Sequence, residues 1–220
     1  KVTVNLPDAQ KVNYLVGVQG DMIGGFTVIG NATKNIVTLN GVTEFGGTYS
    51  DHFVSSLYGG YSYTGTVSDN VVNIDGGKFG GTVYGGAQGL VDGQYGLPQS
   101  MSNYFSGYVE DLTFTSTGDV MNNSVTISGG GYNISAGVGN GGTVYGGLIE
   151  ANLPTAGNTT RFGDVHDNKV EISGTGMANN VYGGAFITYL DTGNTDTLQM
   201  GSVTNNHVDI LSGGYGHVVA

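Results

Sequence analysis

The stretch Gly118-Asp119-Val120-Met121-Asn122-Asn123-Ser124-Val125-Thr126-Ile127 decides the fold, because close copies of it occur at four other places in the chain. Each copy begins with Gly and carries Asn, Val and Ile or Leu at alternate positions of its second half. The copies are residues 30–39, 65–74, 118–127, 163–172 and 201–210. Alternate residues of a β-strand share one face, so each copy predicts a half-buried strand with its apolar side chains inward.

A second motif, an apolar residue followed by Tyr and two Gly, alternates with these blocks. Its four copies are Leu57-Tyr58-Gly59-Gly60, Val83-Tyr84-Gly85-Gly86, Val144-Tyr145-Gly146-Gly147 and Val181-Tyr182-Gly183-Gly184. Met22-Ile23-Gly24-Gly25 resembles a degenerate fifth copy. Paired glycines suit a corner between two stacked strands. Regular alternation of two motifs predicts an all-β repeat protein, a solenoid whose coils stack on one another.

The Asn of each block lies on the inward side of its strand. These residues are Asn35, Asn70, Asn123, Asn168 and Asn206. Stacked coils place them above one another, where their amides can bond along the stack and offset the cost of burial. We expect a structural ladder at a turn, and the alternative is a metal or substrate site.

The motif tyrosines are expected to form a second column, an aromatic ladder that stabilises the stack. They are Tyr58, Tyr84, Tyr145 and Tyr182. Neighbouring residues of a strand point to opposite faces, so the Val and Tyr of one motif cannot both face the core. Val is the better core residue. An outward stripe of Tyr that binds sugar rings or a protein partner is therefore the alternative, and the direction of the column stays open.

Composition excludes several classes of protein. The 220 residues include 42 Gly, and only 10% are charged, which disfavours long helices. Lys and Arg total 6 against 17 Asp and Glu, a net charge of −11, so nucleic-acid binding and polybasic membrane contacts are not expected. Without Cys there are neither disulfides nor thiolate metal sites. No apolar run approaches the roughly 18 residues that span a bilayer.

Three segments exceed what a minimal coil needs, and we expect them to be inserted loops. They are residues 87–118, 148–163 and 185–201, all rich in Asn, Thr, Gln and Ser. Each directly follows a Tyr-Gly-Gly motif, which predicts that all three leave the stack at one corner as neighbours. The candidate ligand contacts are six of their aromatic residues: Tyr95, Tyr104, Phe105, Tyr108, Phe186 and Tyr189.

Enzymatic chemistry has little support. Candidate carboxylate pairs come from Asp119, Asp164 and Asp209, or from Glu171 with Asp209, but an ordinary surface role is expected for all of them. Asp164 shares a strand face with His166, where a weak metal site is conceivable and a surface His is the simpler interpretation. We therefore expect no catalytic residue, no metal site and no cofactor.

Taken together, the motifs resemble the passenger repeats of large type V autotransporter adhesins from anaerobic Gram-negative bacteria. The match is closest over residues 58–86 and covers about residues 22–220. The resemblance implies a right-handed parallel β-helix that is displayed outside the cell, at the bacterial surface, and used for adhesion and virulence. The C-terminal membrane barrel of that family is missing from these residues, so membrane insertion of this segment is not expected.

We expect residues 1–220 to form one β-solenoid domain, a fragment of a longer repeat array in which residues 1–21 are less regular. Its expected function is that of a cell-surface or secreted adhesin module, whose inserted loops bind a protein or glycan of a host or partner bacterium. The alternative is a self-assembling extracellular filament or stalk subunit that stacks head-to-tail through open coil edges. A polysaccharide-active enzyme ranks third.

Overall fold

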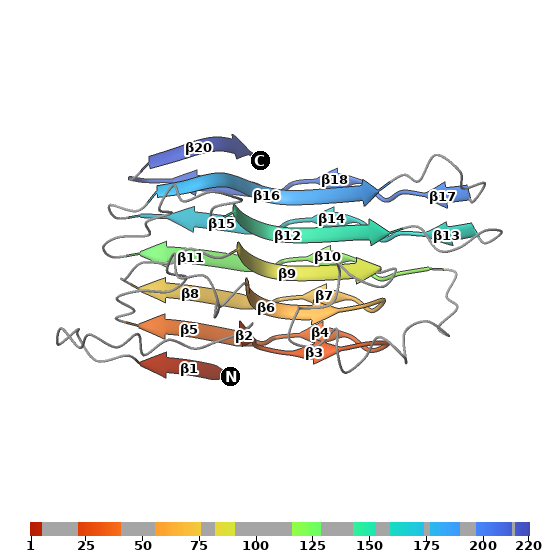
Figure 1. Cartoon of the computed structure of the whole chain (residues 1–220), viewed down its shortest axis with the longest axis horizontal. Coiled ribbons are helices and arrows are strands. Elements are labelled where there is room, and N and C mark those ends of the chain that lie inside the picture. The colour runs from red at the N-terminus through yellow and green to blue at the C-terminus, as the bar shows by residue number, and fades with distance from the viewer. Residues whose placement is uncertain are drawn as a thin grey trace, which may run out of the picture.

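Parallel β-strands make up the regular structure of the described part of the chain (Figure 1). The computed structural model describes residues 1–5, 22–40, 56–75, 82–90, 116–128, 143–152, 159–173, 177–189, 197–212 and 214–220. Within these ranges the strands stack in three parallel sheets, which confirms the predicted all-β, solenoid-like arrangement. The same ranges contain no helix long and apolar enough to cross a membrane.

The second halves of the five blocks, together with the N-terminal strand, form a sheet that we call sheet A. Its strands, in spatial order, are β1 (Val2–Asn5), β5 (Ile36–Asn40), β8 (Val71–Asp75), β11 (Ser124–Ser128), β15 (Lys169–Ile172) and β19 (His207–Ile210). The central Val of each block pairs with the central Val of the next, as Val72 does with Val125 and Val125 with Val170. Equivalent residues of the repeats therefore lie directly above one another.

The Tyr-Gly-Gly motifs belong to sheet B. Its strands are β2 (Met22–Ile23), β3 (Phe26–Thr27), β6 (Ser56–Ser62), β9 (Thr82–Leu90), β12 (Thr143–Asn152), β16 (Met177–Tyr189) and β20 (Gly214–Val219). Both β2 and β3 pair with β6, on either side of the glycines Gly24 and Gly25. The degenerate copy in residues 22–25 thus occupies the same register as the complete motifs.

The first halves of the blocks form sheet C from very short strands. They are β4 (Ala32–Thr33), β7 (Val67–Ser68), β10 (Val120–Met121), β14 (Val165–His166) and β18 (Val203–Thr204). A separate two-stranded sheet pairs β13 (Thr159–Arg161) with β17 (Thr197–Gln199) beyond the ends of β12 and β16 (Figure 1). The chain visits sheets A, B and C in turn, and each circuit adds one coil to the stack.

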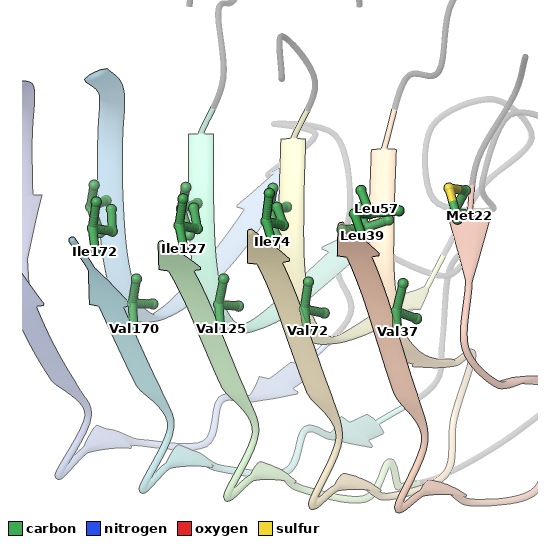
Figure 2. Packing of buried hydrophobic residues seen from close by; sticks show 13 residues of the cluster. Met22, Val37, Leu39, Leu57, Val72, Ile74, Val125, Ile127, Val170 and Ile172 are labelled. Carbon is green, nitrogen blue, oxygen red and sulfur yellow. The ribbon is translucent and has the colours of Figure 1, made fainter. Parts of the chain in front are cut away.

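The larger core cluster lies between sheets A and B (Figure 2). Val37, Val72, Val125 and Val170 form one row, and Leu39, Ile74, Ile127 and Ile172 form a second row beside it. The Val of each complete Tyr-Gly-Gly motif also belongs to this cluster, except that Leu57 takes its place in β6. Burying the same few apolar side chains in every coil is the main source of stability for such a stack.

A second cluster packs sheet C against the later part of the sheet B strands. Val67, Val120 and Val165 contribute from sheet C and are fully buried. Ile149 of β12 and Phe162, which follows β13, are buried in the same cluster. Each coil therefore fills two interior spaces, one on either side of the Asn-bearing corner.

The predicted loops begin too early in the sequence. After their glycine pairs, β9, β12 and β16 continue to Leu90, Asn152 and Tyr189. Side chains immediately after the pairs, such as Leu148 and Ile149, are buried, and burial keeps this portion of the strand in the sheet. The connections that follow, residues 91–115, 153–158 and 190–196, lie outside the described residues.

Candidate functional site

A row of Asn side chains connects successive coils at the corner between sheets C and A. Asn70 Nδ2 donates to Asn123 Oδ1 at 2.9 Å, and the backbone N–H of Asn70 donates to the same oxygen at 3.1 Å. The same pair of bonds joins Asn35 to Asn70, Asn123 to Asn168, and Asn168 to Asn206. The second amide hydrogen of Asn70 is donated to the carbonyl oxygen of Ala32 at 2.9 Å.

Three of these amides, Asn70, Asn123 and Asn168, use their full hydrogen-bonding capacity. An Asn amide offers two N–H donors and two oxygen lone pairs. Each of the three donates both hydrogens and accepts two bonds, and each is buried. A metal ion or a substrate would need an oxygen lone pair, and none is left at these positions. The geometry favours a structural row over a binding site.

The residue that precedes each of these Asn has a left-handed backbone, a feature that the sequence analysis missed. The five residues are Lys34, Asp69, Asn122, Asp167 and Asn205, with φ between 54° and 59°. Asn and Asp tolerate this conformation better than other non-glycine residues, and four of the five positions carry one of them. Four of the five blocks carry an Asp-Asn or Asn-Asn pair at this point, and this recurring pair is the sequence feature from which the turn could have been predicted.

The glycine pairs leave room for the Asn row. A Cβ added to Gly86 would lie 2.5 Å from Asn123 Nδ2, and one added to Gly147 would lie 2.5 Å from Asn168 Nδ2. The first glycine of a pair faces the next coil instead, since a Cβ on Gly85 would lie 2.5 Å from the carbonyl oxygen of Gly146. The two sequence motifs are therefore the two sides of one contact, which explains why they alternate.

The four motif tyrosines stack ring on ring. Successive centroids are 4.6, 5.3 and 4.9 Å apart, with interplanar angles of 10° or less. The column is Tyr58, Tyr84, Tyr145 and Tyr182. Ile23 occupies the same register position before Tyr58, and Val219 occupies it after Tyr182. Aliphatic residues thus continue the column at both ends.

The Tyr column does not offer free ring faces. Its rings point away from the buried Val row, as alternation requires, but Tyr58 is only 9% exposed and packs edge-on against Tyr61. Both faces of Tyr84 and of Tyr145 contact neighbouring rings. A sugar ring could stack on either residue only if the column opened, so the aromatic stripe is poorly suited to glycan binding.

The predicted ligand contacts fall into three groups. Tyr95, Tyr104, Phe105 and Tyr108 lie outside the described residues. Tyr189 is the last residue of β16, where it pairs with Asn152. Phe186 is a strand residue rather than a loop residue, and its half-buried ring meets Phe162 edge-on at 5.6 Å. The burial of Phe186 follows from its register with Ile149, which is also inside the stack.

The three connections after sheet B begin at paired residues. Leu90 of β9 pairs with Ala151 of β12, and Asn152 of β12 pairs with Tyr189 of β16. The chain therefore leaves the stack at neighbouring points in three successive coils.

The same connections also end at paired positions. Ser116 forms a bridge with Arg161, and Arg161 pairs with Gln199 of β17. The N–H of Thr117 donates to the Arg161 carbonyl at 2.9 Å. Arg161 was expected in a loop, but it lies in β13, where its backbone helps to align the three returning segments.

Asp164, one of the candidate catalytic carboxylates, bonds the backbone of the next coil. Its Oδ1 accepts from the Ser202 N–H at 2.7 Å and from Ser202 Oγ at 3.0 Å. These bonds, the backbone one first, lower the pKa of Asp164. Asp119 has the equivalent role in the preceding coil, where its Oδ1 accepts from the Asp164 N–H at 2.9 Å. A carboxyl held ionised in this way is unsuited to the role of a general acid.

The other candidate pair, Glu171 and Asp209, belongs to an exposed charge cluster on sheet A. Lys169 Nζ lies 3.0 Å from Glu171 Oε2 and 3.4 Å from Asp209 Oδ2, and His207 Nε2 lies 2.8 Å from Asp209 Oδ1. Partial desolvation opposes ionisation of Asp209, but the bonds from His207 and Lys169 outweigh it and lower its pKa. The hydrogen bond to Glu171 is the main cause that raises the pKa of Lys169.

The conceivable metal site at Asp164 and His166 is not assembled. His166 Nδ1 lies 2.7 Å from Asp167 Oδ2, on the exposed turn, while Asp164 is engaged with Ser202. Among the described residues, no group of three or more His, Cys, Asp or Glu could hold a metal ion. Comparisons with protein-family models, with curated proteins and with solved structures gave no match.

Proposed function

We propose that this chain is the binding module of a cell-surface or secreted bacterial adhesin, in which the coil stack presents three neighbouring connections to a receptor. The observation that carries the proposal is the pairing of the residues where those connections start and end. The described residues at the two ends of these connections lie next to one another in successive coils. Residues 91–115, 153–158 and 190–196 would then form one composite surface.

The coil stack suits the role of a scaffold. Asn amides join each of the five Asn-bearing coils to the next, and stacked rings join four coils, so that the connections start from fixed positions. Recognition residues are commonly carried on loops that a rigid framework positions. We infer that here, too, the coil stack is the framework and the connections carry the recognition residues. We also infer that the coil is right-handed, which is the usual sense of crossovers between parallel strands. This arrangement agrees with the resemblance to autotransporter passenger repeats.

The candidate contacts are aromatic residues near the connections. Tyr95, Tyr104, Phe105 and Tyr108 all belong to the longest of the three, and Tyr189 stands where the third begins. Tyr supplies a large contact area at a low cost in conformational entropy, which is why it is frequent in binding loops. Phe186 is left out of the proposed surface because its ring packs against Phe162.

The proposed partner is a protein or glycan on a host cell or a partner bacterium, met at the bacterial outer surface. A net charge of −11 makes nucleic acids and anionic membranes poor partners. Binding of this kind requires neither a metal nor a cofactor, and the proposal includes no catalytic step.

The test is binding of the purified chain to a glycan array and to a panel of host and bacterial cells. Saturable binding is expected, and replacing residues 92–114 with a short Gly-Ser turn should abolish it while the circular dichroism spectrum keeps its β signature. The matched control shortens residues 130–141, which connect sheets A and B at a different corner. That variant should bind like the parent chain.

A finer variant changes Tyr95, Tyr104, Phe105 and Tyr108 to Ala together and leaves the connection at its full length. It should weaken binding without changing the thermal midpoint, since the described strands and core clusters contain none of these four residues. Unchanged binding in this variant and in the shortened one would overturn the proposed surface.

A further inference from the structure

The Tyr column is a row of oxidisable groups in ring contact. The chain contains neither Cys nor Trp, the two side chains that compete most effectively with Tyr for a one-electron oxidant. A Tyr phenol that loses one electron and its hydroxyl proton becomes a neutral phenoxyl radical. The column therefore holds, side by side in successive coils, the groups on which a one-electron oxidation of this chain would settle.

Neighbouring rings of the column are almost translated copies of one another. Tyr58 pairs with Tyr84, Tyr84 with Tyr145, and Tyr145 with Tyr182 in the register of sheet B. The centroid separations of 4.6, 5.3 and 4.9 Å are close to the spacing of about 4.8 Å between neighbouring strands. The ring planes differ by 10° or less. Equivalent carbons of two neighbouring rings, including those beside the hydroxyl groups, therefore lie about one strand spacing apart.

Three of the four rings keep some contact with solvent. Tyr84, Tyr145 and Tyr182 are half-buried, whereas Tyr58 is 9% exposed. The rings point away from the Val row that fills the core, so that a proton lost from a phenol can pass to water. Tyr145 lies between Tyr84 and Tyr182 and so has a half-buried Tyr on both sides. Oxidation of the column should therefore be centred on Tyr145.

We propose that Tyr145 is a site of oxidative cross-linking, where a carbon–carbon bond to Tyr84 or Tyr182 joins two successive coils. Each of the two rings first loses an electron and its hydroxyl proton. The radicals combine through the ring carbons beside the hydroxyl groups, and the hydrogens on those carbons move to the phenoxyl oxygens, which restores both aromatic rings. The oxidant is a peroxide activated by a haem peroxidase, and hydrogen peroxide takes up the two electrons and two protons to form water.

The fold decides which radicals can meet. Radicals held in different parts of a folded chain cannot diffuse together, whereas those of the column are already in contact. Tyr61 shows the contrast, because its ring lies 5.7 Å from that of Tyr58 but at 84° to it, so that equivalent carbons do not face each other. Burial is the main cause that raises the pKa of the Tyr61 hydroxyl, and it makes loss of that proton harder. In-register stacking, rather than proximity alone, selects the pair that couples.

A bond of this kind would act on the stack as a disulfide does in other proteins. Closing a loop lowers the conformational entropy of the unfolded chain and so favours the folded state. This chain has no Cys with which to form a disulfide. The cross-linked chain should therefore unfold at a higher temperature. The inference is independent of the proposed receptor surface, because it involves only residues of the coil stack.

The experiment exposes the full chain, at low concentration, to hydrogen peroxide and a haem peroxidase. The product is then cleaved at Asp and Glu, and its peptides are identified by mass spectrometry. Glu110 separates Tyr84 from Tyr145, and Asp164 separates Tyr145 from Tyr182, so each expected cross-link joins two peptides. The Tyr145 peptide should be found joined to that of Tyr84 or Tyr182, with the loss of two hydrogen atoms. Oxidation of Met adds oxygen instead and is distinguished by its mass.

The whole product should show dityrosine fluorescence and run as a single chain on a denaturing gel. Its thermal midpoint should exceed that of Tyr145→Phe after the same treatment. Comparing chains that have both been oxidised removes the effect of Met oxidation from this difference. Circular dichroism before the reaction shows that the strands of each variant persist.

Tyr145→Phe keeps a ring in the stack but removes the phenol that both expected cross-links share, so it should lose these peptides. Tyr189→Phe is the matched control, because Tyr189 belongs to the same sheet but pairs with Asn152 rather than with another Tyr. It should cross-link as the parent chain does. A parent chain without a cross-link at Tyr145, or equal loss of the cross-linked peptides in Tyr189→Phe, would overturn the proposal. So would a Tyr145 that couples chiefly to a tyrosine outside the column.

Discussion

Asn70 and Asn123 are 53 positions apart in the chain, yet Asn70 Nδ2 donates to Asn123 Oδ1 across 2.9 Å. Each of the first four Asn of the row donates to the Asn of the following coil, so the bonds run in one direction along the stack. Coils are therefore joined by side chains as well as by sheet hydrogen bonds. Each interior Asn supports two coil contacts, which makes it a sensitive position for substitution.

Asn123→Asp is expected to destabilise the chain strongly. In the parent chain Asn123 Nδ2 donates to Asn168 Oδ1 and to the Val67 carbonyl, each at 3.0 Å. The substitution replaces this nitrogen with an oxygen, which cannot donate to either acceptor when it is ionised. A buried charge without a partner costs about 3–5 kcal/mol. Urea unfolding at neutral pH should show a lower midpoint, and acid should restore some of the loss because the protonated carboxyl can donate again.

Asn122→Asp is the control for that substitution. Asn122 precedes Asn123, is exposed and has a φ of 54°, and the equivalent residues Asp69 and Asp167 are already Asp. Its urea midpoint should match that of the parent chain. Equal losses in the two variants would contradict the claim that the buried row, rather than the turn, carries the stability.

Gly65→Ala should destabilise the stack, whereas Gly30→Ala should be nearly neutral. The added methyl group at Gly65 would overlap the backbone of Gly30, and backbone cannot move aside as a side chain can. Overpacking of this kind costs about 1–3 kcal/mol. At Gly30 the methyl group meets only the Thr27 side chain, at 3.0 Å. The test compares the thermal midpoints of the two variants at low protein concentration. A larger drop in midpoint for Gly30→Ala than for Gly65→Ala would contradict the claim that the Gly65 methyl group overlaps the coil below.

Lys34→Asn is expected to stabilise the chain. Lys34 has a φ of 59°, and its four counterparts in the other coils are Asn or Asp. A left-handed conformation costs an ordinary residue about 1–2 kcal/mol, and Asn recovers some of this through local hydrogen bonding. The thermal midpoint should rise. Thr33→Asn, at the neighbouring exposed strand position, should give no such gain, and a gain at both positions would point to a cause other than φ.

The stacked parallel arrangement was predictable because the blocks carry two independent signals for it. Val125 and Ile127 alternate with polar residues, which indicates a strand with one buried face, and both residues recur in register in the next coil. A repeat with one apolar face can bury that face only against its own copies or the facing side of the coil. The alternation of apolar and polar residues, together with the recurrence of the blocks, is therefore compatible with few arrangements of the strands.

The ends of the sheet B strands and the tight turn were not predictable in the same way. Leu148 and Ile149 follow the glycine pair, and paired glycines are interpreted as a corner at which the strand ends, since Gly within a strand often marks a bend. Here the glycines are needed within the strand, where they face the Asn amides. The turn at Asn122 depends on a backbone angle that many residues can adopt at some cost, so composition indicates it only weakly.

Asp164 should make the stability of the chain sensitive to acid. Its pKa is lowered in the folded state, mainly by the bond from the Ser202 N–H. A carboxyl whose pKa is lowered by folding stabilises the folded chain at pH values above its pKa in the unfolded chain, which is about 3.9 for Asp. This stabilisation is lost as the pH falls through the pKa of the folded state. Asp164→Asn keeps the acceptor oxygen, as Asn31 does for Thr66 in the first coil, but removes the charge.

Urea midpoints of the parent chain and of Asp164→Asn, measured from neutral pH down to pH values below about 3, test this link to the folded pKa. The variant should be less stable at neutral pH, because its bond to Ser202 is no longer charge-assisted. The two midpoints should converge as the carboxyl of the parent chain is protonated. Ser202→Ala removes the Oγ donor and keeps the N–H, so its acid sensitivity should be intermediate. A constant difference between the parent chain and Asp164→Asn across the whole range would show that the bond between Asp164 and Ser202 does not couple protonation to folding.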